Sequence, residues 1–206
     1  MAMEDRPQIY LLTPPEIDLS NFPGTLAQVL DTHDIACLRL NLATRDVDQI
    51  TRAADVIREL AHARDVALVI QEHVGLVETL GLDGIHLTDG ARSVRKTREA
   101  LGADAIVGTF AAASKHDGMT AGETGADYVA FGPVGTSALG DGTRAEHALF
   151  EWWSEAIEVP IVAEGDLSED VIATLAPVTD FFAIGEEIWR HDDPSAALGQ
   201  LIAAMG

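Results

Sequence analysis

The 206-residue sequence predicts an α/β fold, a single (β/α)8 TIM barrel that takes in residues 1–206. Eight short apolar runs rich in β-branched residues recur along the chain, with helical segments between them at a repeat of roughly 25 residues. The runs are apolar nearly throughout rather than alternating, which is typical of parallel strands covered on both faces. An open doubly wound sheet is the alternative. It leaves two runs unexplained, and LLTPPEID stands where a G-x-G-x-x-G would follow the first strand.

The pattern places each strand and helix in order. The predicted strands are 8–13, 35–40, 66–71, 84–88, 105–110, 128–134, 160–165 and 181–185. The predicted helices are 25–33, 47–63, 75–81, 93–102, 117–125, 146–158, 168–176 and 195–205. Asp46 and Ser168 stand where helices begin, and both residue types are good N-caps.

Composition indicates one domain in a reducing compartment. The chain is 47% apolar but only 5% aromatic, so it is able to bury one core of small aliphatic side chains. Cys37, the only cysteine, lies in the apolar run IACLRL, which excludes a disulfide framework and predicts a buried thiol. MAMEDRPQIYLL lacks the features of a secretory signal, and no apolar run approaches ~18 residues. We therefore expect a soluble cytoplasmic protein.

The net charge of −21 limits the partners. Nucleic acid and anionic membrane surfaces are repelled, and no basic stripe offsets this field. A small-molecule substrate is the partner that remains. Since barrels often form oligomers, a homo-oligomer stays open.

In this fold the site lies at the carboxyl ends of the strands. Arg39 in LRL is a guanidinium within an apolar strand and needs acceptors, which a ligand at the mouth is able to supply. His86 stands between Ile85 and Leu87, so it is either an interior histidine or a site residue. His116 lies in the polar loop AAASKHDG and is either solvated or functional. Glu72 and Asp89 offer hard oxygen ligands to a divalent cation.

The ends of three later strands are rich in glycine. One of these strands lies in GADYVAFGPVG, residues 125–135, and ends at Gly132 and Pro133. These residues indicate that the backbone closely approaches another group at the mouth. Gly165 and Gly185 follow the last two strands, where this fold often holds a phosphate on backbone amides. Asp166, Glu186 and Glu187 stand beside them and repel an anion. With an extended exit after the last strand, at most one of Glu186 and Glu187 faces the mouth, and we expect no anion in this corner.

Several of these segments together resemble the thiamine phosphate synthase and thiazole tautomerase superfamily. They are IYLLT, LR, DGIHLTDG, the Ser114-Lys115-His116 segment ahead of GADYVAFGPV, and PIVAEGDL, in the same order along nearly the whole chain. The resemblance implies a barrel that joins hydroxymethylpyrimidine pyrophosphate to thiazole phosphate, with Mg²⁺ on the leaving pyrophosphate. The family's glycine pair after strand 7 is Gly165-Asp166 here, and its serine-alanine pair after strand 8 is Glu186-Glu187.

The resemblance also implies a role for each candidate residue. Arg39 faces the pyrophosphate, Glu72 and Asp89 hold Mg²⁺, and Ser114 and His116 line the pyrimidine side. The remaining expected substrate contacts are Asn41, Gln71, His86, Gly132, Pro133, Thr136, Gly165 and Gly185.

Two alternative functions are also consistent with these residues. One is a thiazole tautomerase in which His116 moves the proton, because an imidazole titrates near neutrality. The other is a non-catalytic barrel whose acidic pocket binds a neutral or cationic heterocycle related to thiamine.

Overall fold

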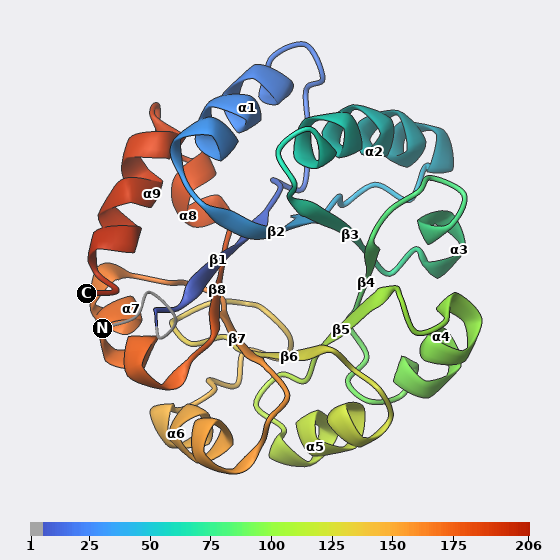
Figure 1. The fold of residues 1–206 in the computed structure, drawn as a ribbon. Helices are drawn as coiled ribbons and strands as arrows, with labels where there is room; N and C mark the ends of the chain where they lie inside the picture. Colours follow the sequence, from blue (N-terminus) through green and yellow to red (C-terminus); the bar gives the residue numbers. More distant parts are fainter. Residues whose placement is uncertain (1–5) are drawn as a thin grey trace.

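Residues 6–206, the part of the chain that the computed structural model describes, form a closed barrel of parallel strands in the order β1 to β8 (Figure 1). This confirms the predicted (β/α)8 fold. The strands are β1 Gln8–Leu12, β2 Ile35–Leu40, β3 Ala67–Gln71, β4 Gly84–Leu87, β5 Ile106–Phe110, β6 Tyr128–Phe131, β7 Ile161–Glu164 and β8 Phe181–Ile184. Residues 1–5, which belong to the segment predicted to lack a secretory signal, lie outside the described part.

The helices form the outer ring (Figure 1). They are α1 Phe22–Thr32, α2 Val47–His62, α3 Val74–Val77, α4 Val94–Leu101, α5 Lys115–Glu123, α6 His147–Ala156, α7 Glu169–Leu175, α8 Glu186–Trp189 and α9 Pro194–Ala203, with a 3₁₀ turn at Ala176–Val178. Both predicted N-caps are confirmed: the Asp46 carboxylate accepts from the amides of Asp48 and Gln49, and Ser168 Oγ accepts from the amide of Val171. Within residues 6–206, no helix has the length and apolarity needed to cross a membrane.

The boundaries differ from the prediction by one to four residues at several elements, such as α1, which begins at Phe22, and α3, which ends at Val77; three further differences bear on the site. The sixth strand ends at Phe131 rather than residue 134, because Gly132 and Pro133 turn the chain. Helix α5 begins at Lys115 rather than residue 117, since Ser114 caps it. The last unit carries a short additional helix, α8, which starts directly after β8.

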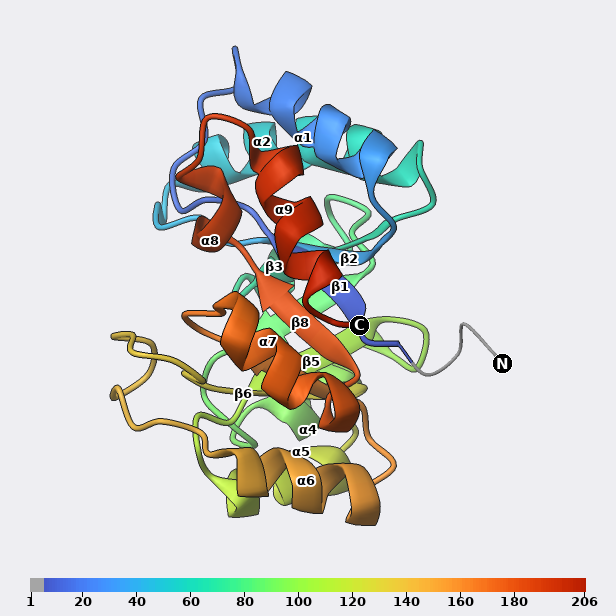
Figure 2. The same ribbon diagram turned by 90° about the vertical axis from the view of Figure 1, so that its left-hand side faces the viewer.

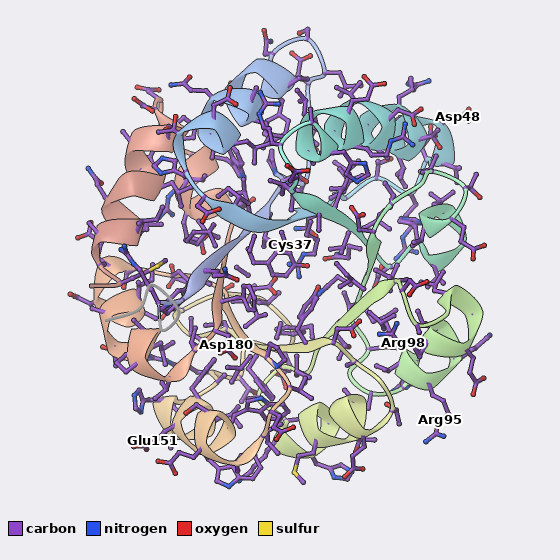
Figure 3. The ribbon with its side chains drawn as sticks, viewed as in Figure 1. Cys37, Asp48, Arg95, Arg98, Glu151 and Asp180 are labelled. Atoms are coloured by element: carbon purple, nitrogen blue, oxygen red, sulfur yellow. The ribbon has the colours of Figure 1, made fainter. Side chains whose placement is uncertain are left out.

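The core has two parts. One lies between the strands and the helices and is built mainly of Leu, Ile, Val and Ala. The other fills the inside of the barrel and includes Tyr10, Val69, Phe110 and Tyr128. Figure 3 shows Cys37 within the ring of strands, whereas the labelled Asp48, Arg95 and Glu151 project outward from the helices. Burial raises the pKa of the Cys37 thiol to about 12.

The inside of the barrel is filled by large side chains from some strands opposite small ones from others. Gly108 on β5 lies beside Tyr128 on β6, and a Cβ at position 108 would lie 1.9 Å from Cζ of the Tyr128 ring. The absent side chain at position 108 therefore creates the space that the Tyr128 ring occupies. Since this ring lies below the mouth, packing here also sets the floor of any site above it.

We predict that Gly108→Ala destabilises the protein by about 2 to 3 kcal/mol, because the new methyl group overpacks the interior against Tyr128. Urea unfolding measures this change. Gly24→Ala is the matched control: Gly24 is exposed in the first turn of α1, and no atom lies within 4 Å of the position that a Cβ would take. Its stability should be unchanged or raised by up to about 1 kcal/mol. Equal effects of both substitutions would contradict the prediction.

Candidate active site

A cavity of about 890 Å³ opens where the strands end. The β6–α6 loop extends beyond the barrel on the same side as α8, which follows β8 (Figure 2). Residues from β2, β3, β4, β5 and β7 and from the loops after β2, β4, β5 and β6 contribute to the walls. The lining residues are Arg39, Asn41, Gln71, His86, Thr88, Asp89, Gly90, Arg92, Phe110, Ala111, Ala112, Ala113, Ser114, Asp117, Leu139, Gly140, Asp141, Thr143 and Glu164.

The cavity brings together about half of the residues that the sequence singled out. Six of them line it: Arg39, Asn41, Gln71, His86, Asp89 and Ser114. The others are not among its lining residues: Glu72, His116, Gly132, Pro133, Thr136, Gly165 and Gly185. The cavity thus lies over β2 to β5, and the glycine turns after β6, β7 and β8 lie to one side of it.

A buried ion pair forms the floor. Arg39 on β2 and Glu164 on β7 are 1% and 5% exposed, and they face each other across the barrel. Arg39 Nη1 donates to Glu164 Oε2 at 3.2 Å, and Nη2 donates to Oε1. Although burial alone lowers the pKa of Arg39, the charge of Glu164 and the hydrogen bonds to it raise that pKa above its usual value, so the guanidinium stays charged. Within the described residues, the buried Arg39 Nε has no hydrogen-bond partner.

A chain of hydrogen bonds lies beside this pair. The hydroxyls of Tyr10 and Tyr128 are 2.5 Å apart, and His86 Nδ1 lies 2.9 Å from the Tyr128 hydroxyl. Burial, reinforced by the nearby Arg39 charge, holds the pKa of His86 well below 6.5. Burial likewise raises the pKa of both tyrosines. His86 is therefore a buried, neutral interior histidine that also lines the cavity, so the two interpretations of this residue are compatible.

Glu72 and Asp89, the expected Mg²⁺ ligands, lie on neighbouring loops after β3 and β4. Both line a smaller pocket of about 430 Å³, and Asp89 also lines the main cavity. Glu72 accepts a hydrogen bond from the Thr88 hydroxyl, and Asp89 Oδ2 accepts from Ser93 Oγ at 2.6 Å. Each carboxylate keeps one oxygen free of these bonds. Among residues 6–206, no cluster of three or more His, Cys, Asp or Glu has the geometry of a metal site.

Ser114 and His116 fall on different surfaces. Ser114 Oγ accepts from the amide of Asp117 at 3.1 Å and caps α5, while the residue also lines the cavity. His116 is exposed in the first turn of α5 and does not line the cavity. Nothing in this geometry favours a proton transfer by His116 to a ligand in the cavity.

The glycine-proline turn after β6 is buried by the loop after β7. A Cβ at Gly132 would lie 2.1 Å from the carbonyl oxygen of Glu164, so only glycine fits there. The amides of Val134 and Gly135 donate to the carbonyl of Gly165 at 3.1 and 3.0 Å. Gly132 and Pro133 thus meet another segment of the chain, and the exposed Thr136 continues this contact through its amide, which donates to Asp166 Oδ2 at 2.7 Å.

The exit of β8 corrects one expectation. The prediction of an extended exit is wrong, because α8 begins at Glu186, immediately after Gly185. The two acids stand in its first turn, where carboxylates are favoured by the unpaired amides and the helix dipole. Glu187 Oε2 accepts from the amide of Gly185 at 2.8 Å, and Glu187 Oε1 accepts from the amide of Leu167 at 3.2 Å. Glu186 is exposed.

Sequence reasoning missed several charged residues of the cavity. Arg92 lies in the turn after β4 and is exposed at the rim. Asp117 and Asp141 add two carboxylates from α5 and the β6–α6 loop. No local pattern distinguishes these residues from other surface charges. The pairing of Glu164 with Arg39 depends on barrel closure, so no local pattern indicates it.

Comparison with known proteins decides the family. A family model described as thiamine monophosphate synthase matches residues 9–186 of the chain. The chain belongs to this family.

Relatives within the thiamine monophosphate synthase family match nearly the whole chain. The thiamine-phosphate synthase of Rhodospirillum centenum is 39% identical over 203 residues, which cover 96% of this chain and 97% of that protein. The thiamine-phosphate synthase of Hyphomonas neptunium is 37% identical, and the match covers 97% of this chain and 94% of that protein. The solved thiamine phosphate pyrophosphorylase from Pyrococcus furiosus has the same fold, with a TM-score of 0.84 at 16% identity and coverage of 99% and 98% of the two chains.

We predict that breaking the ion pair from one side destabilises this family member strongly. Glu164→Gln leaves a buried, uncompensated guanidinium and should lower the free energy of unfolding by about 3 kcal/mol. In a double-mutant cycle with Arg39→Met, urea unfolding should give a coupling energy of about 2 kcal/mol. The exposed pair Arg64 and Asp31 is the control, and its cycle should give less than about 1 kcal/mol. Similar coupling energies in the two cycles would refute the special role of the buried pair.

The lowered pKa of His86 predicts a dependence of stability on pH. Below about pH 6.5 the unfolded chain binds a proton at this residue and the folded protein does not, so stability falls as the pH is lowered towards the folded pKa. The loss approaches about 1.4 kcal/mol per pH unit. Unfolding of the unmodified protein and of His86→Gln, measured from pH 7.5 to 5, should show this extra slope only in the unmodified protein. Parallel curves would argue against it.

Proposed function

We propose that this protein is a thiamine phosphate synthase of thiamine biosynthesis, which joins hydroxymethylpyrimidine pyrophosphate to thiazole phosphate and releases pyrophosphate. The observation that carries the proposal is the match to named synthases over nearly the full length of the chain. In the reaction, the lone pair of the thiazole nitrogen forms a bond to the pyrimidine methylene carbon. The bond from that carbon to the pyrophosphate oxygen breaks, and the pyrophosphate leaves with the electron pair.

The cavity offers neutral polar groups and apolar walls to the pyrimidine. Asn41 and Gln71 bring carboxamides, and the neutral His86 adds a ring nitrogen without a positive charge. Phe110 and Leu139 supply apolar surface. A flat heterocycle with an amino group and ring nitrogens suits such a lining. The polar side chains would form hydrogen bonds with its edge, and the apolar side chains would cover its two faces.

The leaving pyrophosphate needs cationic partners. The charge of Arg39 is already balanced by Glu164, so Arg39 is better placed to hold the floor rigid than to neutralise a new anion. Arg92 is exposed on the cavity rim and has no acidic partner within salt-bridge distance among the described residues. We assign Arg92 the main side-chain contact to the pyrophosphate.

Magnesium belongs to the proposal as well. Mg²⁺ in such sites binds one or two carboxylates and completes its shell with phosphate oxygens and water, and the free oxygens of Glu72 and Asp89 fit this donor set. When bound, the ion would neutralise charge that develops on the leaving group. With two ligands from the protein, the rest of the shell would come from a phosphorylated substrate and water.

The proposed setting is the cytoplasm, which suits a chain with one unpaired cysteine. Assembly into a homo-oligomer stays a prediction.

The decisive experiment incubates the purified protein with hydroxymethylpyrimidine pyrophosphate, Mg²⁺ and either the thiazole phosphate or the thiazole alcohol. Chromatography should detect a coupled product, and pyrophosphate release should depend on the thiazole. Absence of product with both thiazoles at high protein concentration would refute the synthase function.

We predict that Arg92→Gln raises the KM for hydroxymethylpyrimidine pyrophosphate 10- to 100-fold, because loss of a charge-assisted hydrogen bond costs about 1.5 to 3 kcal/mol. Steady-state kinetics measures the change. Arg95→Gln removes the same charge from a side chain that projects outward from α4 (Figure 3), and it should leave the KM unchanged. If both substitutions raise the KM equally, a general field effect and not a contact by Arg92 explains the result.

A further inference from the structure

Three side chains, Tyr10, Tyr128 and His86, form a hydrogen-bonded row inside the barrel. They come from β1, β6 and β4, and they are 2%, 8% and 1% exposed, so bulk water scarcely reaches them. His86 lines the main cavity, whereas Tyr10 and Tyr128 are not among its lining residues. The two hydroxyls therefore act on a ligand in the cavity only through His86.

The row leaves one ring nitrogen of His86 for a ligand. Nδ1 lies 2.9 Å from the Tyr128 hydroxyl, and the imidazole stacks on the Tyr128 ring with 5.8 Å between the ring centroids. These two contacts fix the orientation of the imidazole. Among residues 6–206, Nε2 has no hydrogen-bond partner, and it does not belong to the fully buried polar atoms that lack one. Nε2 is therefore accessible from the cavity.

The number of protons in the row decides which nitrogen carries the ring proton. Each hydroxyl has one proton, and a neutral imidazole has one on either nitrogen. If Nδ1 carried it and donated to Tyr128, one of the two hydroxyl protons would have no acceptor, because no other described group bonds either hydroxyl. If Tyr10 donates to Tyr128 and Tyr128 donates to Nδ1, both hydroxyl protons are bonded. A buried donor without an acceptor is costly, so the ring proton stands on Nε2.

All three members of the row stay neutral. Burial raises the pKa of both tyrosine hydroxyls and lowers the pKa of His86. The Arg39 guanidinium carbon lies 5.5 Å from the centre of the Tyr10 ring, and its positive charge also disfavours an imidazolium. The same three protons are therefore present throughout the neutral pH range.

We propose that Tyr10 and Tyr128 are positioning residues of the enzyme, which hold the ring proton of His86 on Nε2 so that this nitrogen donates to a ring nitrogen of the bound pyrimidine. The identity of the ligand rests on the proposed synthase function. His86 lies at the floor of the cavity, whereas the exposed Arg92 lies at the rim, so the ring and not the pyrophosphate reaches Nε2. A neutral donor also brings no full positive charge to a ring that loses electron density as the pyrophosphate leaves.

Nitrogen NMR of protein labelled with ¹⁵N at histidine tests the position of the proton without any turnover. The chain has seven histidines, and the signals of His86 are those that vanish in His86→Gln. We expect a protonated Nε2 and an unprotonated Nδ1 that accepts a hydrogen bond. In Tyr128→Phe the Nδ1 signal should shift towards that of an unbonded acceptor. A proton on Nδ1 in the unmodified protein, or an unshifted Nδ1 signal in Tyr128→Phe, overturns the proposal.

Steady-state kinetics compares two carboxamides at position 86. Gln is long enough to offer an acceptor to Tyr128 and an N–H to the cavity, whereas Asn is one methylene shorter and reaches only one of them. His86→Asn should raise the KM for hydroxymethylpyrimidine pyrophosphate roughly 5- to 20-fold, and His86→Gln by less than about threefold. The kcat should change less than the KM, because the contact exists before and during bond breaking. Equal effects of Gln and Asn on the KM contradict the assignment of the donor.

The tyrosines are tested in the same assay. Tyr128→Phe should raise the KM at least about threefold, and Tyr10→Phe should have a smaller effect because the bond from Tyr128 to His86 remains. Val129→Ala is the control: Val129 is the next residue on β6, fully buried in the core outside the strands. It should lower the melting temperature and leave the KM and the His86 signals unchanged. If Tyr128→Phe behaves in the same way as Val129→Ala, the tyrosine has a structural role only and the proposal fails.

Calorimetry with hydroxymethylpyrimidine pyrophosphate separates this inference from the synthase function. If the purified protein couples no thiazole, the synthase function fails, and binding of this compound takes the place of the KM. Binding that is retained in His86→Gln and weakened in His86→Asn supports the proposal. Equal binding by both variants, or no binding by the unmodified protein, overturns it.

Discussion

The ion pair between Arg39 and Glu164 is the constraint on which the site depends. The two residues stand on β2 and β7, strands that are not neighbours in the barrel, so their bonds cross its interior. Removing two charges from water is unfavourable unless the pair is well formed, and the two-bond contact offsets this desolvation. Two buried charges are stable only when the side chains around them offer polar groups and leave no voids. Tyr10, Tyr128 and His86 meet this need through their hydrogen bonds, and Gly108 leaves the space for the Tyr128 ring.

The mouth above this floor is organised by backbone conformations that side chains rarely adopt. Glu72, Ala112 and Asp166 all have φ between 50° and 65°, and they follow β3, β5 and β7 respectively. Such conformations turn the chain sharply at the end of a strand, and they concentrate at functional sites. Contacts from a neighbouring strand or loop hold them, such as the bond from the Glu72 amide to the carbonyl of His86 at 3.0 Å. The rim is therefore shaped by the barrel and not by the loops alone.

The charges at the mouth divide it into two regions. Over β2 to β5 the cavity is lined by cationic and neutral polar groups together with carboxylates. Over β7 and β8 the amides face carboxylates of the same chain. The family relation explains the barrel and the first region. The second region is where this chain departs from the glycine and serine-alanine residues expected from the family.

The sequence by itself determined the eight strand and helix units, the N-caps at Asp46 and Ser168 and the family, because periodicity, capping and motifs are local properties. It also indicated which strand ends carry polar residues, and six of the candidates line one cavity. Two acids after a glycine are also consistent with the start of a helix, and the structure has a helix at Glu186 instead of the predicted extended exit. Only the tertiary structure decided that Arg39 pairs with Glu164, 125 positions away, and that Glu187 rather than Glu186 covers the amides of both loops. The physical reason is that closure of the barrel determines which distant groups lie within hydrogen-bond distance of each other. The local sequence around each residue does not predict these pairs.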